Sequence, residues 1–192
     1  MKAVTRIAIF ASGNGSNAQR IAEHFRDRNL LEISAIYSNN PKAFVLKRAE
    51  KLGIPSVLFD RHSFLETTDV LSDLLSRKTD WIVLAGFLWL IPGYLLDAFP
   101  NRIINIHPAL LPKFGGKGMY GARVHEAVIA SGEKESGITI HYVNANYDEG
   151  QVIFQANCPV SKDETASSLA EKVHQLEFEY YPKVISDLLL KR

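Results

Sequence analysis

The stretch RIAIFASGNGSNA, residues 6–18, decides the fold. Its first half, residues 6–11, is almost continuously apolar, which predicts a strand covered by helices on both faces. The glycine turn SGNGSN follows, and apolar residues from Ala18 to Phe25 then recur at the spacing of one helix face. A strand, a glycine turn and a helix in this order open a βαβ unit. The backbone amides of such a turn can hold a phosphate at the positive end of the helix.

The rest of the chain repeats this alternation of short apolar runs and helical patterns, without repeats or linker-like segments. We therefore predict an α/β protein with a doubly wound, mostly parallel, Rossmann-like sheet, folded as a single domain over residues 1–192. A kink is expected at Pro182 in the last helix. Further strands are predicted over 31–37, 55–59, 81–85, 102–107, 137–143 and 151–154, and further helices over 43–52, 63–76, 124–131, near Pro92 and from Thr165 onward.

Composition excludes several classes of protein. The net charge of +1 over 192 residues gives no general attraction to nucleic acid or to an anionic membrane. There is neither a signal peptide nor an apolar run of the roughly 20 residues needed to cross a bilayer, so we expect a cytoplasmic protein. The single cysteine, Cys158, excludes an intrachain disulfide framework. No cluster has metal-ligand spacing, so no metal is predicted.

The glycine turn has the form G-x-G-x-x-A, which by itself is typical of a dinucleotide site. Such a site also needs a carboxylate at the end of the second strand, for the ribose hydroxyls. Here that strand ends in Ser38, Asn39 and Asn40, and the turn lacks the lysine of the triphosphate-binding loop. NAD and ATP are therefore disfavoured. A bare strand-to-helix turn with a capping serine remains the alternative to a phosphate site.

A second group of polar residues is predicted to carry the chemistry. Asn105 and His107 lie two apart at the end of a strand, so their side chains share a face. An amide donor can stabilise an oxyanion and an imidazole can move protons, which is the pair that acyl transfer requires. The glycine-rich segment 108–122 that follows is long for a loop without function. A structural histidine is the alternative for His107, and a turn-forming aspartate is the alternative for Asp148.

Five stretches, in order over essentially the whole chain, resemble the glycinamide ribonucleotide formyltransferases. NIHPALLP with the downstream aspartate is shared by folate-dependent formyltransferases generally, and SGNGSN narrows the match to the purine enzyme. The resemblance implies a sheet with a C-terminal antiparallel part. It also implies formyl transfer from 10-formyltetrahydrofolate, as cosubstrate, to the amine of glycinamide ribonucleotide in purine biosynthesis. The stretches are SGNGSN, AGFLWLIP, INIHPALLPKF, ESGITIHYVNANYDEGQVIFQ and LEFEYYP.

The resemblance also implies roles for individual residues. Asn105 and His107 look like the catalytic pair, and Asp148 like the carboxylate that orients His107 and favours its protonated form. Glu177 looks like a substrate-binding glutamate, although a solvated residue beside the apolar stripe is the alternative. Core packing is the alternative for the loop 88–91. Substrate phosphate is assigned to Gly15, Ser16 and Asn17, and folate to Leu88, Trp89, Leu90, Ile91, Asn105, Asn144, Ala145, Asn146, Tyr147 and Asp148.

Two departures limit the transfer of roles. The family's Asp-Gly-Gly is Asp148-Glu149-Gly150 here, and the loop GGKGMYG is longer than the familiar pattern. Thr67 and Arg61 are both candidates for the place of a folate-contacting arginine, but spacing does not decide between them, so neither is assigned. Other folate-linked formyl enzymes and a nucleotide-binding module without turnover are the alternative functions. We expect small-molecule partners only and a monomer or weak homodimer.

Overall fold

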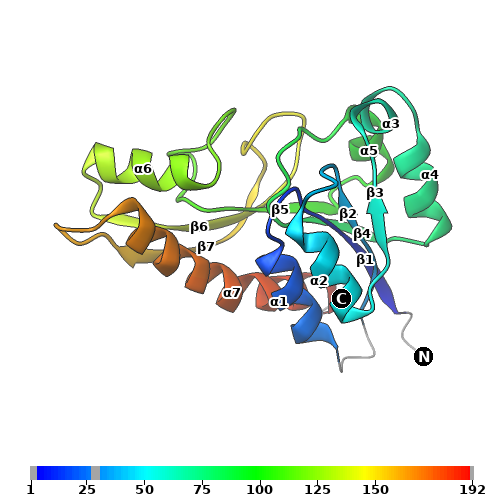
Figure 1. Ribbon diagram of the computed structural model, residues 1–192. Helices are drawn as coiled ribbons and strands as arrows, with labels where there is room; N and C mark the ends of the chain where they lie inside the picture. Colours follow the sequence, from blue (N-terminus) through cyan, green and yellow to red (C-terminus); the bar gives the residue numbers. More distant parts are fainter. Residues whose placement is uncertain (1–3, 27–30, 191–192) are drawn as a thin grey trace.

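The computed structural model describes residues 4–26 and 31–190. Within these ranges the chain forms one seven-stranded sheet in the order β3-β2-β1-β4-β5-β6-β7 (Figure 1). β1 to β5 are parallel, whereas β6 pairs antiparallel with both β5 and β7. The predicted sheet with an antiparallel C-terminal part is therefore confirmed. The strands are β1 (Thr5–Phe10), β2 (Leu31–Ser38), β3 (Ser56–Leu58), β4 (Trp81–Leu84), β5 (Ile103–His107), β6 (Glu135–Tyr142) and β7 (Val152–Pro159).

Helices cover both faces of the sheet (Figure 1). One layer contains α1 (Ser16–Phe25), α2 (Phe44–Leu52), α6 (Ala122–Ser131) and the long α7 (Ala166–Leu190), and the other contains α3 (Arg61–Leu65), α4 (Asp69–Ser76) and α5 (Gly93–Ala98). None of the described helices is long and apolar enough to cross a membrane.

The apolar run of β1 explains why the strand lies at the centre of the sheet. Ile7 and Ile9 belong to the core beneath α1, α2 and α7, whereas Ala8 and Phe10 belong to the core beneath α4 and α5. All four are fully buried. Because successive side chains of a strand point to opposite faces, a strand covered on both sides has to be apolar throughout.

Two expectations for individual elements were wrong. The helix predicted over 63–76 is divided into α3 and α4, because the Thr67 hydroxyl donates to the Ser63 carbonyl and accepts the Asp69 amide, which competes with the helical pattern. β7 extends to Pro159, well beyond the predicted end at 154, since its whole length pairs with β6. Pro182 lies inside α7, and the helix continues to Leu190.

Candidate active site

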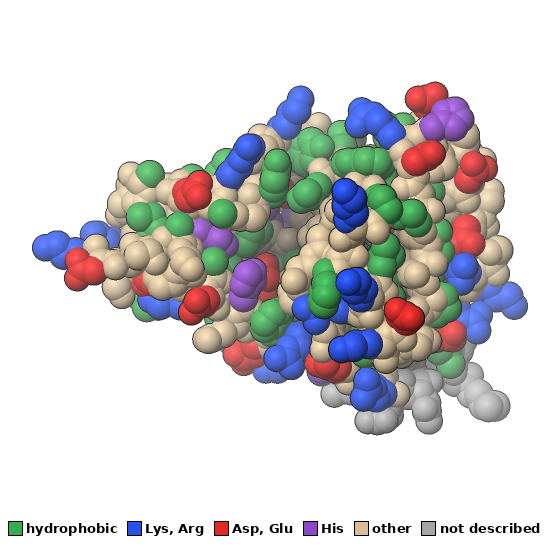
Figure 2. Space-filling view, in the orientation of Figure 1, with side chains coloured by type: hydrophobic (Ala, Val, Ile, Leu, Met, Phe, Trp, Pro, Cys, Tyr) green, Lys and Arg blue, Asp and Glu red, His purple; other side chains and the backbone are tan. Residues whose placement is uncertain are grey.

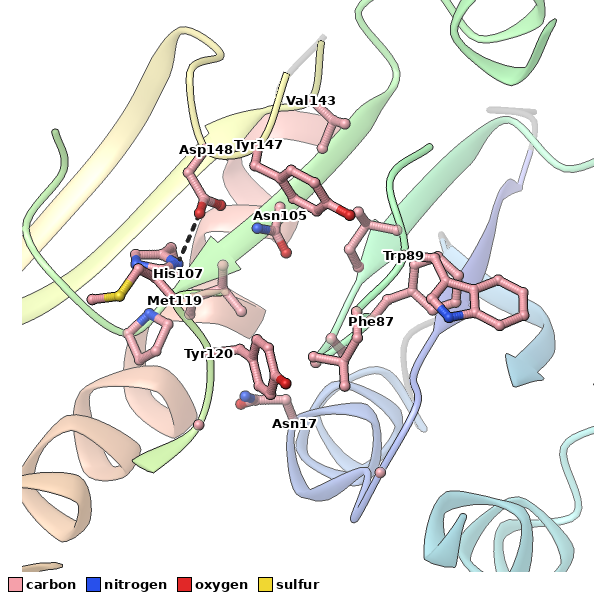
Figure 3. A pocket seen from close by; sticks show the side chains of 18 of the residues that line it. Asn17, Phe87, Trp89, Asn105, His107, Met119, Tyr120, Val143, Tyr147 and Asp148 are labelled. Atoms are coloured by element: carbon pink, nitrogen blue, oxygen red, sulfur yellow. Dashed lines mark ion pairs between the residues drawn. The ribbon is translucent and has the colours of Figure 1, made fainter. Parts of the chain in front are cut away.

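A cavity of about 670 Å³ opens over the carboxyl edge of the parallel strands, where the sequence predicts it. The segments that follow β1, β4 and β5 contribute to its wall, as do the β6–β7 loop and one face of α7. Figure 2 shows the hollow near the middle of the molecule, with hydrophobic side chains gathered along its upper rim. In Figure 3, Asn105, His107 and Asp148 lie on one side of the cavity and Trp89 on the other.

Asn105, His107 and Asp148 meet inside this cavity. The Nδ1 atom of His107 lies 3.5 Å from Oδ2 of Asp148 (Figure 3). Its Nε2 lies 2.7 Å from the carbonyl oxygen of Phe114. A carbonyl only accepts, so Nε2 carries a hydrogen and Nδ1 is the nitrogen that faces the carboxylate and can take up a proton.

His141, on β6, completes the cluster. Its Nδ1 donates to the carbonyl of Tyr142 at 2.8 Å, so its Nε2 accepts from the Asn105 amide at 3.2 Å. The same Nε2 is 3.6 Å from Oδ1 of Asp148. His141 therefore fixes the orientation of the Asn105 amide. The antiparallel register pairs Asn105 with His141 directly, a relation that the sequence pattern alone does not show.

Two opposing effects act on the pKa of His107. Burial lowers the pKa of His107 below its usual value and outweighs the opposing effect of the Asp148 carboxylate. The expected effect of Asp148, which favours protonated His107, is therefore present but smaller than that of burial. Burial also tends to raise the pKa of Asp148, but the neighbouring His141 and His107 and the Gly116 amide lower it overall. The site thus pairs a carboxylate with an imidazole that is neutral at neutral pH.

The glycine-rich segment is built onto Asp148. The amide of Gly116 donates to Oδ2 of Asp148 at 2.9 Å. A Cβ on Gly115 would lie 2.5 Å from a methyl carbon of Leu111 and 3.2 Å from Cβ of Asp148, so a side chain there would require these neighbours to shift. Asp148 itself has φ 57, in the left-handed region that aspartate tolerates. The loop and the carboxylate therefore hold each other in place.

The glycine turn is shaped for close approach of a ligand. Gly15 precedes α1 with φ 74, and no side chain caps the helix, so the capping-serine alternative is not what the structure contains. Within the described chain, the amides of Gly13, Asn14 and Gly15 donate to no protein acceptor. The turn lines the cavity from residue 13 to residue 17. Backbone amides without a protein acceptor just before a ten-residue helix are available to bind an anion.

Glu177 is a buried carboxylate that faces the cavity, not a solvated surface residue. It is 6% exposed, and the Asn17 amide donates to its Oε2 at 2.9 Å. Burial raises the pKa of Glu177. The Oδ1 atom of Asn17 is buried without a hydrogen-bond partner. Two polar groups that are costly to bury therefore line the same part of the cavity.

His125 is a second cavity residue that sequence reasoning missed. Its side chain is buried and its Nδ1 has no partner. Burial, together with the nearby His174 and His107, lowers its pKa to about 4. His125 is therefore a neutral polar group of the wall, close to His174 of α7. His125 lies three residues after the glycine-rich segment 108–122. This position gave no signal, because the path of the segment decides which face of α6 lines the cavity.

The residues predicted to bind folate divide into two sets. Leu88, Trp89, Leu90 and Ile91 line the cavity, and so do Asn146 and Tyr147. Asn144 and Ala145 are exposed and lie outside this lining, and their contact with folate stays a prediction. The Asn144 side chain accepts the Asn146 amide at 3.0 Å and so shapes the loop instead.

The two residues left open for the arginine position also differ. The guanidinium of Arg61 lies 5.9 Å from the centre of the Trp89 ring, whereas the Thr67 hydroxyl is used at the break between α3 and α4. In the described part of the chain, no group of three or more histidine, cysteine or acidic side chains is arranged to hold a metal ion.

A doubly wound sheet with an amide, an imidazole and a carboxylate in a cavity at its carboxyl edge defines an α/β acyl-transfer enzyme. A model of the family described as formyl transferase matches residues 5–185. The chain therefore belongs to the formyl transferase family.

Individual relatives agree with this assignment. The chain is 40% identical to phosphoribosylglycinamide formyltransferase, chloroplastic, of Vigna unguiculata over 97% of its own length, and it spans 62% of that protein. It is 35% identical to phosphoribosylglycinamide formyltransferase of Bacillus subtilis, covering 96% of this chain and 94% of the relative. The crystal structure of phosphoribosylglycinamide formyltransferase from Streptococcus pneumoniae superposes with a TM-score of 0.85 at 36% identity, over 96% of this chain and 99% of that one.

Proposed function

We propose that the protein transfers the formyl group of 10-formyltetrahydrofolate to the amine of glycinamide ribonucleotide, giving formylglycinamide ribonucleotide and tetrahydrofolate. The names of its relatives support this reaction, and family members generally use formyl-tetrahydrofolate. The observation that carries the proposal is that one cavity contains both the Asn105–His107–Asp148 cluster and a glycine turn with three free amides.

The two ends of the cavity suit the two substrates. The phosphate of glycinamide ribonucleotide would bind the amides of the glycine turn, beside Ser16 and Asn17. Glu177 would accept hydrogen bonds from the ribose hydroxyls, because the oxygens of its carboxyl group are acceptors. The folate pterin would bind along the loop 88–91, whose apolar residues line the cavity.

The chemistry follows from the hydrogens that each side chain holds. The substrate amine attacks the formyl carbon, a C–N bond forms and the carbonyl electrons move to oxygen. One N–H of Asn105 is held by His141, and the other can donate to this oxyanion. Nδ1 of His107 takes the proton released by the attacking nitrogen, and Asp148 stabilises the resulting imidazolium. The proton then passes to N10 of the folate as the C–N10 bond breaks and the carbonyl re-forms.

The direct test mixes the purified protein with 10-formyltetrahydrofolate and glycinamide ribonucleotide and follows release of tetrahydrofolate. Release that requires glycinamide ribonucleotide supports the proposal. Release with water or with an amino sugar, and none with glycinamide ribonucleotide, would instead assign the chain to another formyl enzyme.

We also propose that the protein acts in the cytoplasm and that it is a monomer or weak homodimer. Size-exclusion chromatography with light scattering tests the oligomeric state.

A further inference from the structure

The outer side of the glycine turn is held by the segment that joins β2 to α2 and by α2 itself. Three consecutive carbonyl oxygens of the turn each accept a hydrogen bond from this segment. The Asn40 side-chain amide donates to the carbonyl of Ser12 at 3.2 Å, and the Val45 amide donates to that of Gly13 at 3.1 Å. Nε of Arg48 donates to the carbonyl of Asn14 at 2.9 Å.

These three bonds determine where the amides of the turn point. In a trans peptide the carbonyl oxygen and the following N–H point in opposite directions. Carbonyls that are turned toward α2 therefore direct the amides of Gly13, Asn14 and Gly15 away from it. These are the three amides without a protein acceptor, and the turn lines the cavity on that side. The contacts with α2 thus create the arrangement of donors that an anion needs.

Arg48 makes the most extensive of these contacts. Besides the Asn14 carbonyl, its Nη2 donates to Oδ1 of the Asn14 side chain at 2.8 Å, and its Nη1 donates to the side-chain oxygen of Gln19 on α1. The guanidinium is stacked over the Phe44 ring, 4.9 Å from its centre. The planar, forked donor set of arginine is required to hold Asn14 at both oxygens. Arg48 therefore joins α2, the turn and α1.

Arg48 also places a positive charge behind the turn. It forms no ion pair with any carboxylate in the described part of the chain, so its charge is not neutralised locally. Figure 2 shows Lys and Arg side chains gathered beside the hollow, over the region of α1 and α2 in Figure 1. A positive charge at the start of a helix that receives an anion adds to the field of the helix amides.

We propose that Arg48 is a positioning residue for the substrate phosphate: it holds the Asn14 peptide so that the Gly15 amide faces the cavity, and it supplies positive charge behind the turn. This inference rests on the proposed function for the identity of the substrate. It deepens that function by assigning the shape of the phosphate site to a side chain outside the cavity lining.

The test compares Arg48→Ala with Lys47→Ala. Lys47 is the adjacent residue of α2, has the same charge and lies 5.9 Å from the same Phe44 ring, but it has no contact with the turn. We expect Arg48→Ala to raise KM for glycinamide ribonucleotide by about tenfold or more, the effect of losing charge-assisted hydrogen bonds. KM for 10-formyltetrahydrofolate and kcat should stay within about twofold. Arg48→Lys should restore only part of the loss, and Lys47→Ala should resemble the wild type.

Calorimetric binding of ribose 5-phosphate separates this inference from the proposed function. If the wild type binds this probe and Arg48→Ala binds it about tenfold more weakly, the positioning role holds even where no formyl transfer is found. If formyl transfer to glycinamide ribonucleotide is found but Arg48→Ala leaves its KM unchanged, the inference is overturned alone. A purely structural role predicts that Arg48→Ala lowers Tm and changes both KM values and kcat together, and this outcome also overturns the inference.

Discussion

Replacing Gly15 by alanine should damage the protein more than the addition of one methyl group normally does. An ideal Cβ on Gly15 would lie 2.2 Å from Cγ2 and 2.9 Å from Cα of Val45, so part of the clash is with backbone and cannot be relieved by a rotamer change. The position also has φ 74, which costs an L-residue roughly 1–2 kcal/mol. Forcing α2 away from the turn adds about 1–3 kcal/mol.

Together these terms amount to about 2–5 kcal/mol of lost unfolding free energy, or a fall in Tm of roughly 4–20 °C for a chain of this size. Gly13→Ala is the matched control, because a Cβ there meets nothing within 4 Å. Thermal unfolding of the two variants and the wild type, followed by circular dichroism, measures the difference. If the Tm of the Gly15→Ala variant is within about 1 °C of that of Gly13→Ala, α2 does not pack on the turn as described. That result would also contradict the claim that contacts with α2 orient the turn amides toward the cavity.

Three further variants test the cavity. Glu177→Gln should keep the hydrogen bond from Asn17 and leave Tm at pH 8 equal or higher, while KM for glycinamide ribonucleotide rises; a clear fall in Tm would contradict this. The pKa of Glu177 is raised in the folded state, so the free energy of unfolding falls as the pH rises from the ordinary pKa of a glutamate through the raised one. Glutamine does not ionise, so the variant does not lose this stability at pH 8. Asp148→Asn should lower the pKa of His107 further, since the carboxylate is what raises it against burial; histidine NMR titration that finds a higher pKa would refute the assignment. His107→Ala should lose about 10²-fold or more in kcat with ribose 5-phosphate binding unchanged, and near-normal turnover would remove His107 from the chemistry.

Local patterns were sufficient to predict the fold. The apolar run of β1 predicted a strand buried on both faces, and the glycine turn after it predicted a βαβ start, because both signals are contained in residues 6–18. The break between α3 and α4 was not predicted, since the residues between the two helices include neither glycine nor proline. The Thr67 side chain ends α3 through hydrogen bonds that periodicity does not report.

The site was predicted in part. The residues that were missed, His141 and Arg48, contact site residues that are far from them in the sequence. Asn105, His107 and Asp148 were found, but His141 was not, because its relation to Asn105 exists only in the β5–β6 register. Arg48 is 34 residues from Asn14, and no sequence signal connects them.

The effect of burial on the His107 pKa was not predicted, for a related reason. The sequence shows that a carboxylate is a neighbour, but it does not show how deeply the imidazole is buried. Burial proves to be the larger effect. Asn144 and Ala145 were assigned to the wall because the loop was treated as a unit, whereas only Asn146, Tyr147 and Asp148 of this loop line the cavity.

Steady-state formyl transfer tests the central claim most directly. The purified chain is supplied with 10-formyltetrahydrofolate, and tetrahydrofolate release is followed with glycinamide ribonucleotide, with an amino sugar phosphate and with no acceptor. The account predicts release only with glycinamide ribonucleotide, and its loss in His107→Ala. Equal release in all three mixtures, or release from glycinamide ribonucleotide that persists in His107→Ala, would contradict it.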